Sequence, residues 1–217
     1  MTKSLFAETI NNTLIIRNLG QQDYLPCWQA MQTFTHQRTE KTLDELWLLE
    51  HPPVFTLGQN GKRQHLLRTT HIPVHQIDRG GQITYHGPGQ LIAYTLIDIK
   101  RKQLSIRQFV TRLEQSIIDL LAQEQIQAES RCKAPGVYVN DKKICSIGLR
   151  VRRGYAFHGL AFNVDMNLEP FSYINPCGHS GLAMTQLSEL KGSQNLSETG
   201  KKLIVCLSKN LGYSEII

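Results

Sequence analysis

Residues 136–164 read GVYVNDKKICSIGLRVRRGYAFHGLAFNV, and their apolar runs predict a β-meander. Val137-Tyr138-Val139 and the run that starts at Lys142 flank Asn140-Asp141, a dipeptide typical of a tight hairpin turn. Upstream, further apolar runs bounded by prolines or glycine-rich turns also predict strands. They cover residues 13–17, 46–57 with a proline pair inside, 74–78, 82–86 and 91–99.

Three helices are predicted around these strands. Residues 105–125 carry apolar side chains at sustained helical spacing, and Ser105 with Gln108 fits a capping box at the start. Residues 23–38, with Asp23 as N-cap, and residues 197–211, interrupted or preceded by Gly200, complete the set. Strand runs with isolated helices, rather than regular βαβ alternation, predict an α+β fold with a mostly antiparallel or mixed sheet.

Composition narrows the class of protein. The 217 residues are 41% hydrophobic and 19% charged, as in soluble enzymes, and no apolar run approaches a membrane span. The N-terminus lacks the apolar core of a signal peptide. The five cysteines form no C-x-x-C pair, and the odd count predicts free thiols in the cytoplasm and no metal site. A net charge of +6 suggests acidic partners, either nucleic acid or an acidic carrier protein.

The motif that indicates a ligand site most clearly is the glycine-rich stretch Arg79–Gln90, RGGQITYHGPGQ. Glycine pairs let the backbone turn sharply and approach a ligand, and Arg79 can serve an anionic or carbonyl group. The alternative is a structural double turn around a hairpin. The pattern is neither a phosphate-binding loop of the Walker type nor a dinucleotide fingerprint, which argues against an ATPase or a dehydrogenase.

Lys143 stands out in the alternating run from Lys143 to Arg152. Period two places it on the more apolar face, together with Cys145, Ile147, Leu149 and Val151. A buried ammonium is costly unless paired, and desolvation would lower its pKa. Periodicity alone favours the alternative, in which Lys143 lies at the strand end and extends to water.

The turn at residues 175–179, Asn-Pro-Cys-Gly-His, presents Cys177 as a possible nucleophile. A thiol becomes reactive when a cation or a helix N-terminus stabilises its thiolate. The alternative is an inert loop cysteine, and His179 need not face the thiol. Three other cysteines have the sequence context of core residues: Cys27, Cys145 and Cys206.

Together these segments resemble the octanoyltransferases of lipoate biosynthesis. The resemblance rests on four motifs in matching order and spacing over about residues 45–190. They are Arg79–Gln90; Lys142–Ile144 with Ser146–Gly148; His158–Ala161 with Asn163; and Asn175–Gly178.

The resemblance implies the α+β fold of biotin and lipoate protein ligases, related to class II aminoacyl-tRNA synthetases, with residues 1–217 forming a single catalytic domain. It assigns Cys177 as nucleophile and Lys143 as the lysine that lowers the thiol pKa and moves protons. It also implies the following substrate-binding residues: Arg79, Gly80, Gly81, Gln82, Ile83, Thr84, Tyr85, His86, Ser146, Ile147, Gly148, Gly159, Leu160 and Ala161.

The implied reaction moves an octanoyl group from octanoyl-acyl carrier protein to a lysine of lipoyl domains, in 2-oxoacid dehydrogenase subunits and the glycine cleavage H protein. A thioester on Cys177 would be the intermediate, with no cofactor and no metal. Backbone amides around residues 159–161 are candidate oxyanion donors. Rival hypotheses are an ATP-dependent lipoate or biotin ligase, a cysteine hydrolase, a nucleic-acid-binding module, and a transferase acting between two lipoyl domains.

Overall fold

A mixed eight-stranded sheet forms the centre of the molecule in the computed structural model, which describes residues 12–132, 134–176 and 181–217. The strand order is β11-β1-β2-β6-β10-β9-β8-β7. The strands are β1 (Thr13–Gln21), β2 (Asp44–Glu50), β6 (Gln90–Asp98), β7 (Glu129–Ser130), β8 (Gly136–Val139), β9 (Lys142–Arg152), β10 (Tyr155–Asn163) and β11 (Glu215–Ile216).

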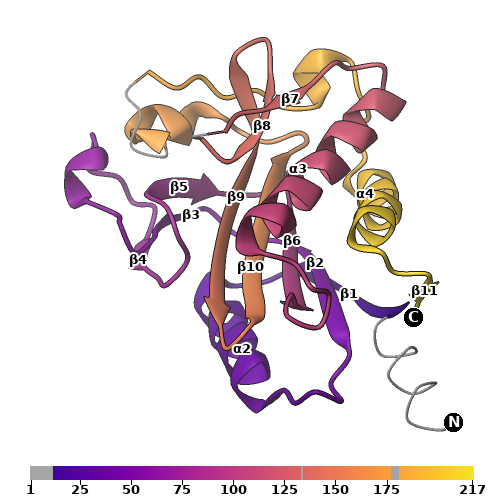
Figure 1. The fold of residues 1–217 in the computed structure, drawn as a ribbon. Helices are drawn as coiled ribbons and strands as arrows, with labels where there is room; N and C mark the ends of the chain where they lie inside the picture. Colours follow the sequence, from indigo (N-terminus) through magenta and orange to yellow (C-terminus); the bar gives the residue numbers. More distant parts are fainter. Residues whose placement is uncertain (1–11, 133, 177–180) are drawn as a thin grey trace, which may run out of the picture.

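A smaller sheet, ordered β4-β3-β5, lies beside the large one (Figure 1). It contains β3 (Val54–Leu57), β4 (Val74–Gln76) and β5 (Ile83–His86). The strand predicted for residues 46–57 is therefore two strands in two sheets. Pro52 and Pro53 separate them, because proline has no N–H to continue a ladder.

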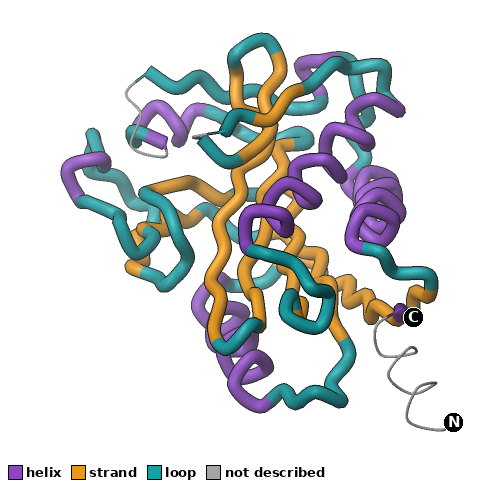
Figure 2. Tube along the Cα trace, viewed as in Figure 1, coloured by secondary structure: helices purple, strands orange, loops and turns teal. Residues whose placement is uncertain are grey.

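Helices cover both faces of the large sheet (Figures 1 and 2). Helices α3 (Ile106–Gln123) and α4 (Leu196–Leu211) bury one face, and α2 (Tyr24–Gln37) covers the other. Short 3₁₀ turns are η1 (Arg63–His65), η2 (Glu169–Tyr173) and η4 (Ser188–Leu190). The predicted α+β class with a mixed sheet is confirmed, since β1 runs parallel to β2 whereas β2, β6, β10 and β9 alternate in direction.

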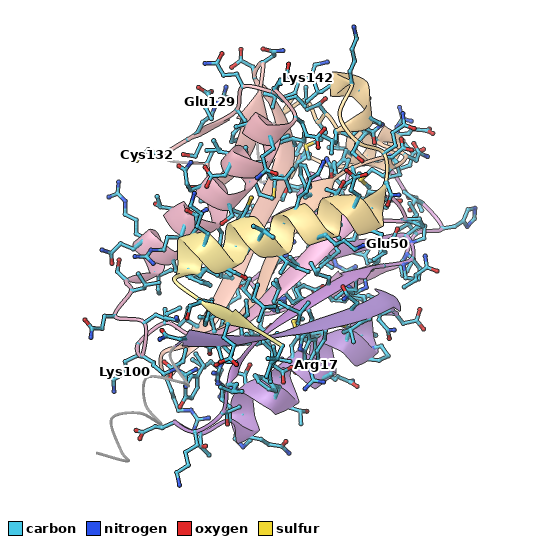
Figure 3. All side chains as sticks on the ribbon, turned by 90° about the vertical axis from the view of Figure 1, so that its right-hand side faces the viewer. Arg17, Glu50, Lys100, Glu129, Cys132 and Lys142 are labelled. Carbon is cyan, nitrogen blue, oxygen red and sulfur yellow. The ribbon has the colours of Figure 1, made fainter. Side chains whose placement is uncertain are left out.

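The predicted helix start is confirmed for α3 and corrected for α4. The Ser105 side chain accepts a hydrogen bond from the Gln108 N–H, and the Gln108 side chain accepts one from the Ser105 N–H, which confirms the capping box. The break predicted at Gly200 is wrong. Helix α4 begins beyond Asn195, whose side chain accepts a hydrogen bond from the Glu198 N–H, and Gly200 is buried close to the sheet that α4 crosses in Figure 3.

The hairpin between β8 and β9 confirms the predicted turn, with positive φ at Asn140 (47°) and Asp141 (66°). Beyond this turn, the pairing register between β8 and β9 shifts by one residue. Tyr138 faces Lys143 and Val137 faces Cys145, which leaves Ile144 as the extra residue of a β-bulge.

This bulge corrects the predicted orientation of Lys143. Ile144 and Cys145 both enter the core beneath α3 and α4, whereas Lys143 shares the opposite face with Tyr138. The predicted shared face of Lys143 and Cys145 is wrong because the bulge breaks period two. The alternative of a side chain that extends to water is also wrong, since Lys143 is 1% exposed.

Within the described residues, no helix has the length and apolar character needed to cross a membrane. The same part of the chain contains no cluster of three or more His, Cys, Asp or Glu side chains arranged to hold a metal ion.

Candidate active site

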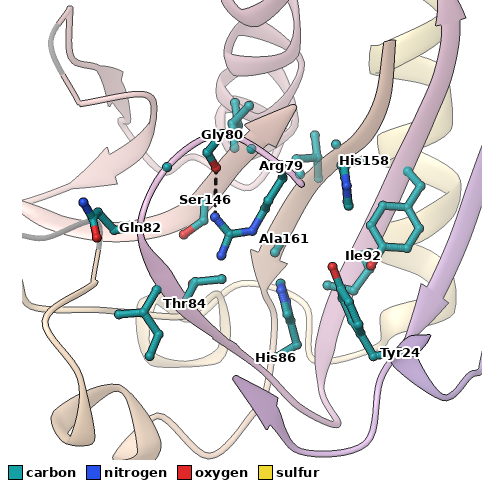
Figure 4. A pocket seen from close by; sticks show the side chains of 17 residues that line it. Tyr24, Arg79, Gly80, Gln82, Thr84, His86, Ile92, Ser146, His158 and Ala161 are labelled. Carbon is teal, nitrogen blue, oxygen red and sulfur yellow. Dashed lines mark hydrogen bonds between the residues drawn. The ribbon is translucent and has the colours of Figure 1, made fainter. Parts of the chain in front are cut away.

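A pocket of about 520 Å³ opens where the Arg79–His86 segment crosses β9, β10 and β6 (Figure 4). It gathers every residue predicted to bind substrate except Tyr85. Its wall is formed by Tyr24, Arg79, Gly80, Gly81, Gln82, Ile83, Thr84, His86, Ile92, Tyr94, Ser146, Ile147, Gly148, His158, Gly159, Leu160 and Ala161. We call this cavity, the candidate site for an acyl chain, the acyl pocket. Among its described lining residues, none has an acidic side chain.

Tyr85 faces away from the acyl pocket because side chains alternate along β5. Its ring packs 5.5 Å from the rings of Phe55 and Phe171, in a separate apolar cluster. Tyr85 therefore does not line this pocket, whereas its neighbours Thr84 and His86 do.

Four lining residues are absent from the predicted set: Tyr24, Ile92, Tyr94 and His158. His158 belongs to one of the four matching motifs, so it could have been included among the predicted substrate-binding residues. Tyr24 begins a helix about 55 residues before Arg79, and no local pattern signals that it reaches this pocket.

Arg79 is buried at the centre of the acyl pocket (Figure 4). Its Nη2 donates to the Thr56 carbonyl at 2.7 Å and to Thr56 Oγ1 at 2.9 Å, and its Nη1 donates to the Gly80 carbonyl at 2.9 Å. The Gly80 N–H donates in turn to the Leu149 carbonyl of β9 at 2.9 Å. These three oxygen acceptors are neutral, and together they hold the guanidinium in place.

His86 belongs to a chain of hydrogen bonds with a defined direction. Asn163 Nδ2 donates to the Thr185 carbonyl, and Gln90 Nε2 donates to Asn163 Oδ1. Gln90 Oε1 therefore accepts from His86 Nδ1–H at 2.8 Å, and His86 Nε2 turns its lone pair to the Thr56 hydroxyl at 3.3 Å.

Burial, followed by the nearby His51 and Arg79, lowers the pKa of His86 to about 3. His86 is therefore neutral at pH 7 and a weak base. Its contacts hold Thr56, and through Thr56 the Arg79 guanidinium, in place.

A second buried chain of hydrogen bonds holds the Tyr94 side chain in place. The Gln22 carbonyl can only accept, so His51 carries its proton on Nδ1 and accepts from the Tyr94 hydroxyl through Nε2, at 2.6 and 2.7 Å. Burial lowers the pKa of His51 to about 4 and raises that of Tyr94, so both groups are neutral at pH 7.

His158 joins the acyl pocket to Asp78. Its φ of 61° lies in the left-handed region although it sits within β10, and its Nε2 donates to Asp78 Oδ1 at 2.9 Å. Trp28 and Gln32 of α2 donate to the same carboxylate. Burial works to raise the pKa of Asp78, but these hydrogen bonds outweigh it and hold the pKa at about 2.

Asp78→Asn is expected to lower the free energy of unfolding by about 1–2 kcal/mol at pH 7, because solvent screens a carboxylate that is partly exposed. The folded pKa of about 2 lies below the usual 3.8, so the contribution is present above about pH 3.8 and is lost as pH falls towards 2. Urea unfolding at pH 7 and pH 3 checks this. An equal difference between the two proteins at both pH values would contradict it.

Lys143 is the buried cation of this region. Its Nζ donates to the Pro135 carbonyl at 2.9 Å and lies 5.3 Å from the centre of the Tyr138 ring. Burial raises the pKa of Glu114, against the Gly136 N–H hydrogen bond and the positive charge of Lys143.

A second cavity, which we call the lysine groove, measures about 910 Å³ and has Lys143 in its wall. It adjoins the acyl pocket, because both share Gly80, Gly81, Gln82, Ile147 and Gly148. The remaining wall is formed by Asn60, Ile106, Val110, Ala134, Pro135 and Leu149.

Cys177 and His179 lie outside the described residues. Ala183 and Thr185, which follow them in the sequence, pair with the Lys143 backbone: Lys143 N–H donates to the Ala183 carbonyl and Thr185 N–H to the Lys143 carbonyl, at 2.9 and 3.0 Å.

The described cysteines differ in reactivity. Burial raises the pKa of Cys145 well above its usual range, that of Cys27 to about 11 and that of Cys206 in the same direction. Thiols with raised pKa values form little thiolate at neutral pH. Cys132 is the exposed cysteine among the described ones and lies at the periphery in Figure 3.

The predicted oxyanion donors of residues 159–161 do not fit the structure. Strand β10 pairs with β6 on one side and β9 on the other across these residues, so the ladders engage the backbone amides.

Two glycines of the acyl pocket should tolerate alanine differently. A Cβ on Gly159 would lie 2.0 Å from the Ala93 carbonyl oxygen, so Gly159→Ala is expected to destabilise the fold by about 3 kcal/mol. A Cβ on Gly148 would lie 2.9 Å from Arg79 Cδ, a side-chain atom, so Gly148→Ala should displace Arg79 and reduce activity about tenfold with little change in Tm. Thermal melts and transfer assays of both variants check the contrast, and equal losses of stability would contradict it.

Residues 23–206 match the lipoyl protein ligase A/B catalytic domain family. The chain is 57% identical to the octanoyltransferase of Shewanella oneidensis over 207 residues, which cover 95% of both chains. It is 58% identical to the octanoyltransferase of Shewanella denitrificans over 205 residues, 94% of this chain and 90% of that one.

Solved structures share the fold at low sequence identity. Lipoate-protein ligase A bound with ATP superposes with a TM-score of 0.74 at 14% identity, covering 95% of this chain and 89% of the other. The bi-partite lipoate protein ligase of Thermoplasma acidophilum gives 0.73 at 14%, covering 95% and 87%. Biotin protein ligase of Aquifex aeolicus gives 0.53 at 15%, covering 92% and 68%.

Proposed function

Because the chain belongs to the octanoyltransferases, acyltransferases of the lipoyl protein ligase A/B catalytic domain family, we propose that it carries an octanoyl group from acyl carrier protein to a lysine of a lipoyl domain through a thioester on Cys177. The acceptors would be lipoyl domains of 2-oxoacid dehydrogenase subunits and the glycine cleavage H protein. Residues 1–217 would act as one cytoplasmic catalytic domain.

The observation that carries the proposal is the buried Lys143 in a groove that adjoins the acyl pocket. A cation close to a thiol lowers the thiol pKa and favours the thiolate. The high pKa values of Cys27, Cys145 and Cys206 make them poor nucleophiles. Cys132 is exposed but lines neither cavity, so Cys177 is the best chemical choice.

In the proposed reaction, the Cys177 thiolate attacks the thioester carbonyl of the donor and expels the carrier thiolate. The carrier thiolate takes a proton from the Lys143 ammonium and leaves as a thiol, so Lys143 becomes neutral. Exchange of one thioester for another is nearly isoenergetic, so the acyl enzyme can accumulate. The neutral amine of a lipoyl-domain lysine then attacks the same carbonyl, forms an amide and releases Cys177. The proton lost from the amine passes to neutral Lys143 or to the leaving thiolate.

The acyl pocket supports the choice of an apolar chain as substrate. Its non-acidic wall combines aliphatic and aromatic side chains with glycines, and each buried CH₂ contributes about 0.8 kcal/mol of binding free energy. Arg79 supplies a fixed cation for the carbonyl end of the chain.

Intact mass after mixing the protein with octanoyl-acyl carrier protein, without acceptor, tests the proposal. One added octanoyl group that hydroxylamine removes and that a lipoyl domain discharges is the expected result. Release of free octanoate instead would indicate a hydrolase. Transfer only with ATP and free octanoate would indicate a ligase, like the lipoate and biotin protein ligases that share this fold.

A further inference from the structure

Cationic side chains from separate segments lie next to residues that line the lysine groove. We call this cationic set, Arg107, Arg150 and Lys62, the mouth of the groove. Arg107 follows the groove residue Ile106 in α3, and its Nη2 lies 3.6 Å from the sulfur of Cys132. Cys132 is two residues from Ala134, which also lines the groove. Arg107 therefore lies close to two segments of the groove wall, one in α3 and one at Ala134.

Arg150 and Lys62 lie beside a third segment of the groove wall, at Asn60. Arg150 follows Leu149 of the groove wall, and its Nη1 donates to Gln59 Oε1 at 2.7 Å, next to Asn60. The exposed Lys62 is held there by its backbone N–H, which donates to Gln82 Oε1 at 3.1 Å.

These cations lack acidic partners within the described chain. Neither Arg107, Arg150 nor Lys62 forms an ion pair among the described residues, whereas Arg131 nearby in sequence pairs with Glu129 and Asp141. The groove wall itself contains no acidic side chain, and Lys143 is its one charged member among the described lining residues.

We propose that this mouth docks an acidic carrier protein, with the phosphodiester of its pantetheine-type arm between Arg107, Arg150 and Lys62 and the arm extended along the groove towards Lys143. The inference rests on the proposed function and adds the docking surface. A carrier arm has an anion at its root, an uncharged middle and a thioester at its tip. The groove offers the complement in the same order: a cationic mouth, a wall of glycine and aliphatic side chains, and Lys143.

The positive charge of the mouth also distinguishes the donor substrate from the acceptor substrate. The acceptor enters with a lysine side chain, and a cationic mouth disfavours an approaching ammonium. The lysine groove therefore fits the donor, and the acceptor would reach the acyl enzyme by another opening.

The test compares two donors with the double variant Arg107→Glu, Arg150→Glu. One is octanoyl-acyl carrier protein, and the other is octanoyl-N-acetylcysteamine, which lacks both the protein and the phosphodiester. Formation of the acyl enzyme from the carrier should fall about 30-fold in kcat/KM and lose its dependence on ionic strength. Formation from the truncated thioester should change less than threefold.

Lys201→Glu, an exposed charge reversal in the second turn of α4, is the control and should behave like the wild type with both donors. Equal losses with both donors would overturn the docking surface in favour of a structural defect. An unchanged rate with the carrier would also overturn it, as would a defect confined to discharge onto the lipoyl domain. Failure of the wild type to form any acyl enzyme would instead refute the proposed function.

Discussion

Cys177→Ser is expected to abolish octanoyl transfer, with a loss of at least about 10³-fold in kcat/KM and no change in Tm. A serine hydroxyl is far less acidic than a thiol, so the variant lacks the anionic nucleophile on which thioester exchange depends. Intact mass should show no octanoyl adduct, and transfer to a lipoyl domain should reach only background.

The matched control is Cys132→Ser, since Cys132 is exposed among the described residues and its serine replacement can still accept the hydrogen bond from Arg107. It should retain activity within about twofold. Transfer by Cys177→Ser at more than a few per cent of the wild-type rate would remove the covalent mechanism and leave direct attack by the acceptor lysine.

Lys143→Ala is expected to lower kcat/KM about 10²- to 10³-fold and to move the alkylation pH profile of Cys177 to higher pH. Removal of the buried ammonium takes away both the charge that favours a thiolate and the group that accepts the proton of the acceptor. Iodoacetamide labelling followed by mass at a series of pH values measures the first effect, and single-turnover discharge measures the second.

Two further variants separate charge from packing. Lys143→Met keeps the length of the side chain without the charge and should behave like Lys143→Ala in the alkylation profile. Lys142→Ala removes the adjacent, exposed lysine and should leave the profile unchanged. A wild-type profile in Lys143→Met would show that the ammonium does not act on the thiol.

Local patterns predicted most of the framework. The apolar spacing of Phe109, Leu113 and Ile117 predicted α3, and all three are fully buried. Asn140-Asp141 predicted the hairpin because its backbone requires positive φ at both positions. These features depend on a few consecutive residues, so the sequence carries them directly.

The errors arose where distant segments meet. The bulge at Ile144 depends on how β9 pairs with β8 and β10 together, and the sequence of β9 alone does not specify it. Tyr24 reaches the acyl pocket only because α2 packs across the large sheet. The side chain of Tyr85, by contrast, could have been placed outside the wall of the acyl pocket from the sequence, since alternation along β5 separates it from Thr84 and His86.

The β-bulge at Ile144 also has a consequence for protein engineering. The turn at Asn140-Asp141 sets the alignment of Lys143, and β10 independently sets the alignment of Cys145 and the residues beyond it. Ile144 absorbs the mismatch between the two. Ile144 is thus the natural junction for grafting a hairpin from another protein of this fold without shifting the acyl pocket. The graft must keep the backbone hydrogen bonds between Lys143 and both Ala183 and Thr185.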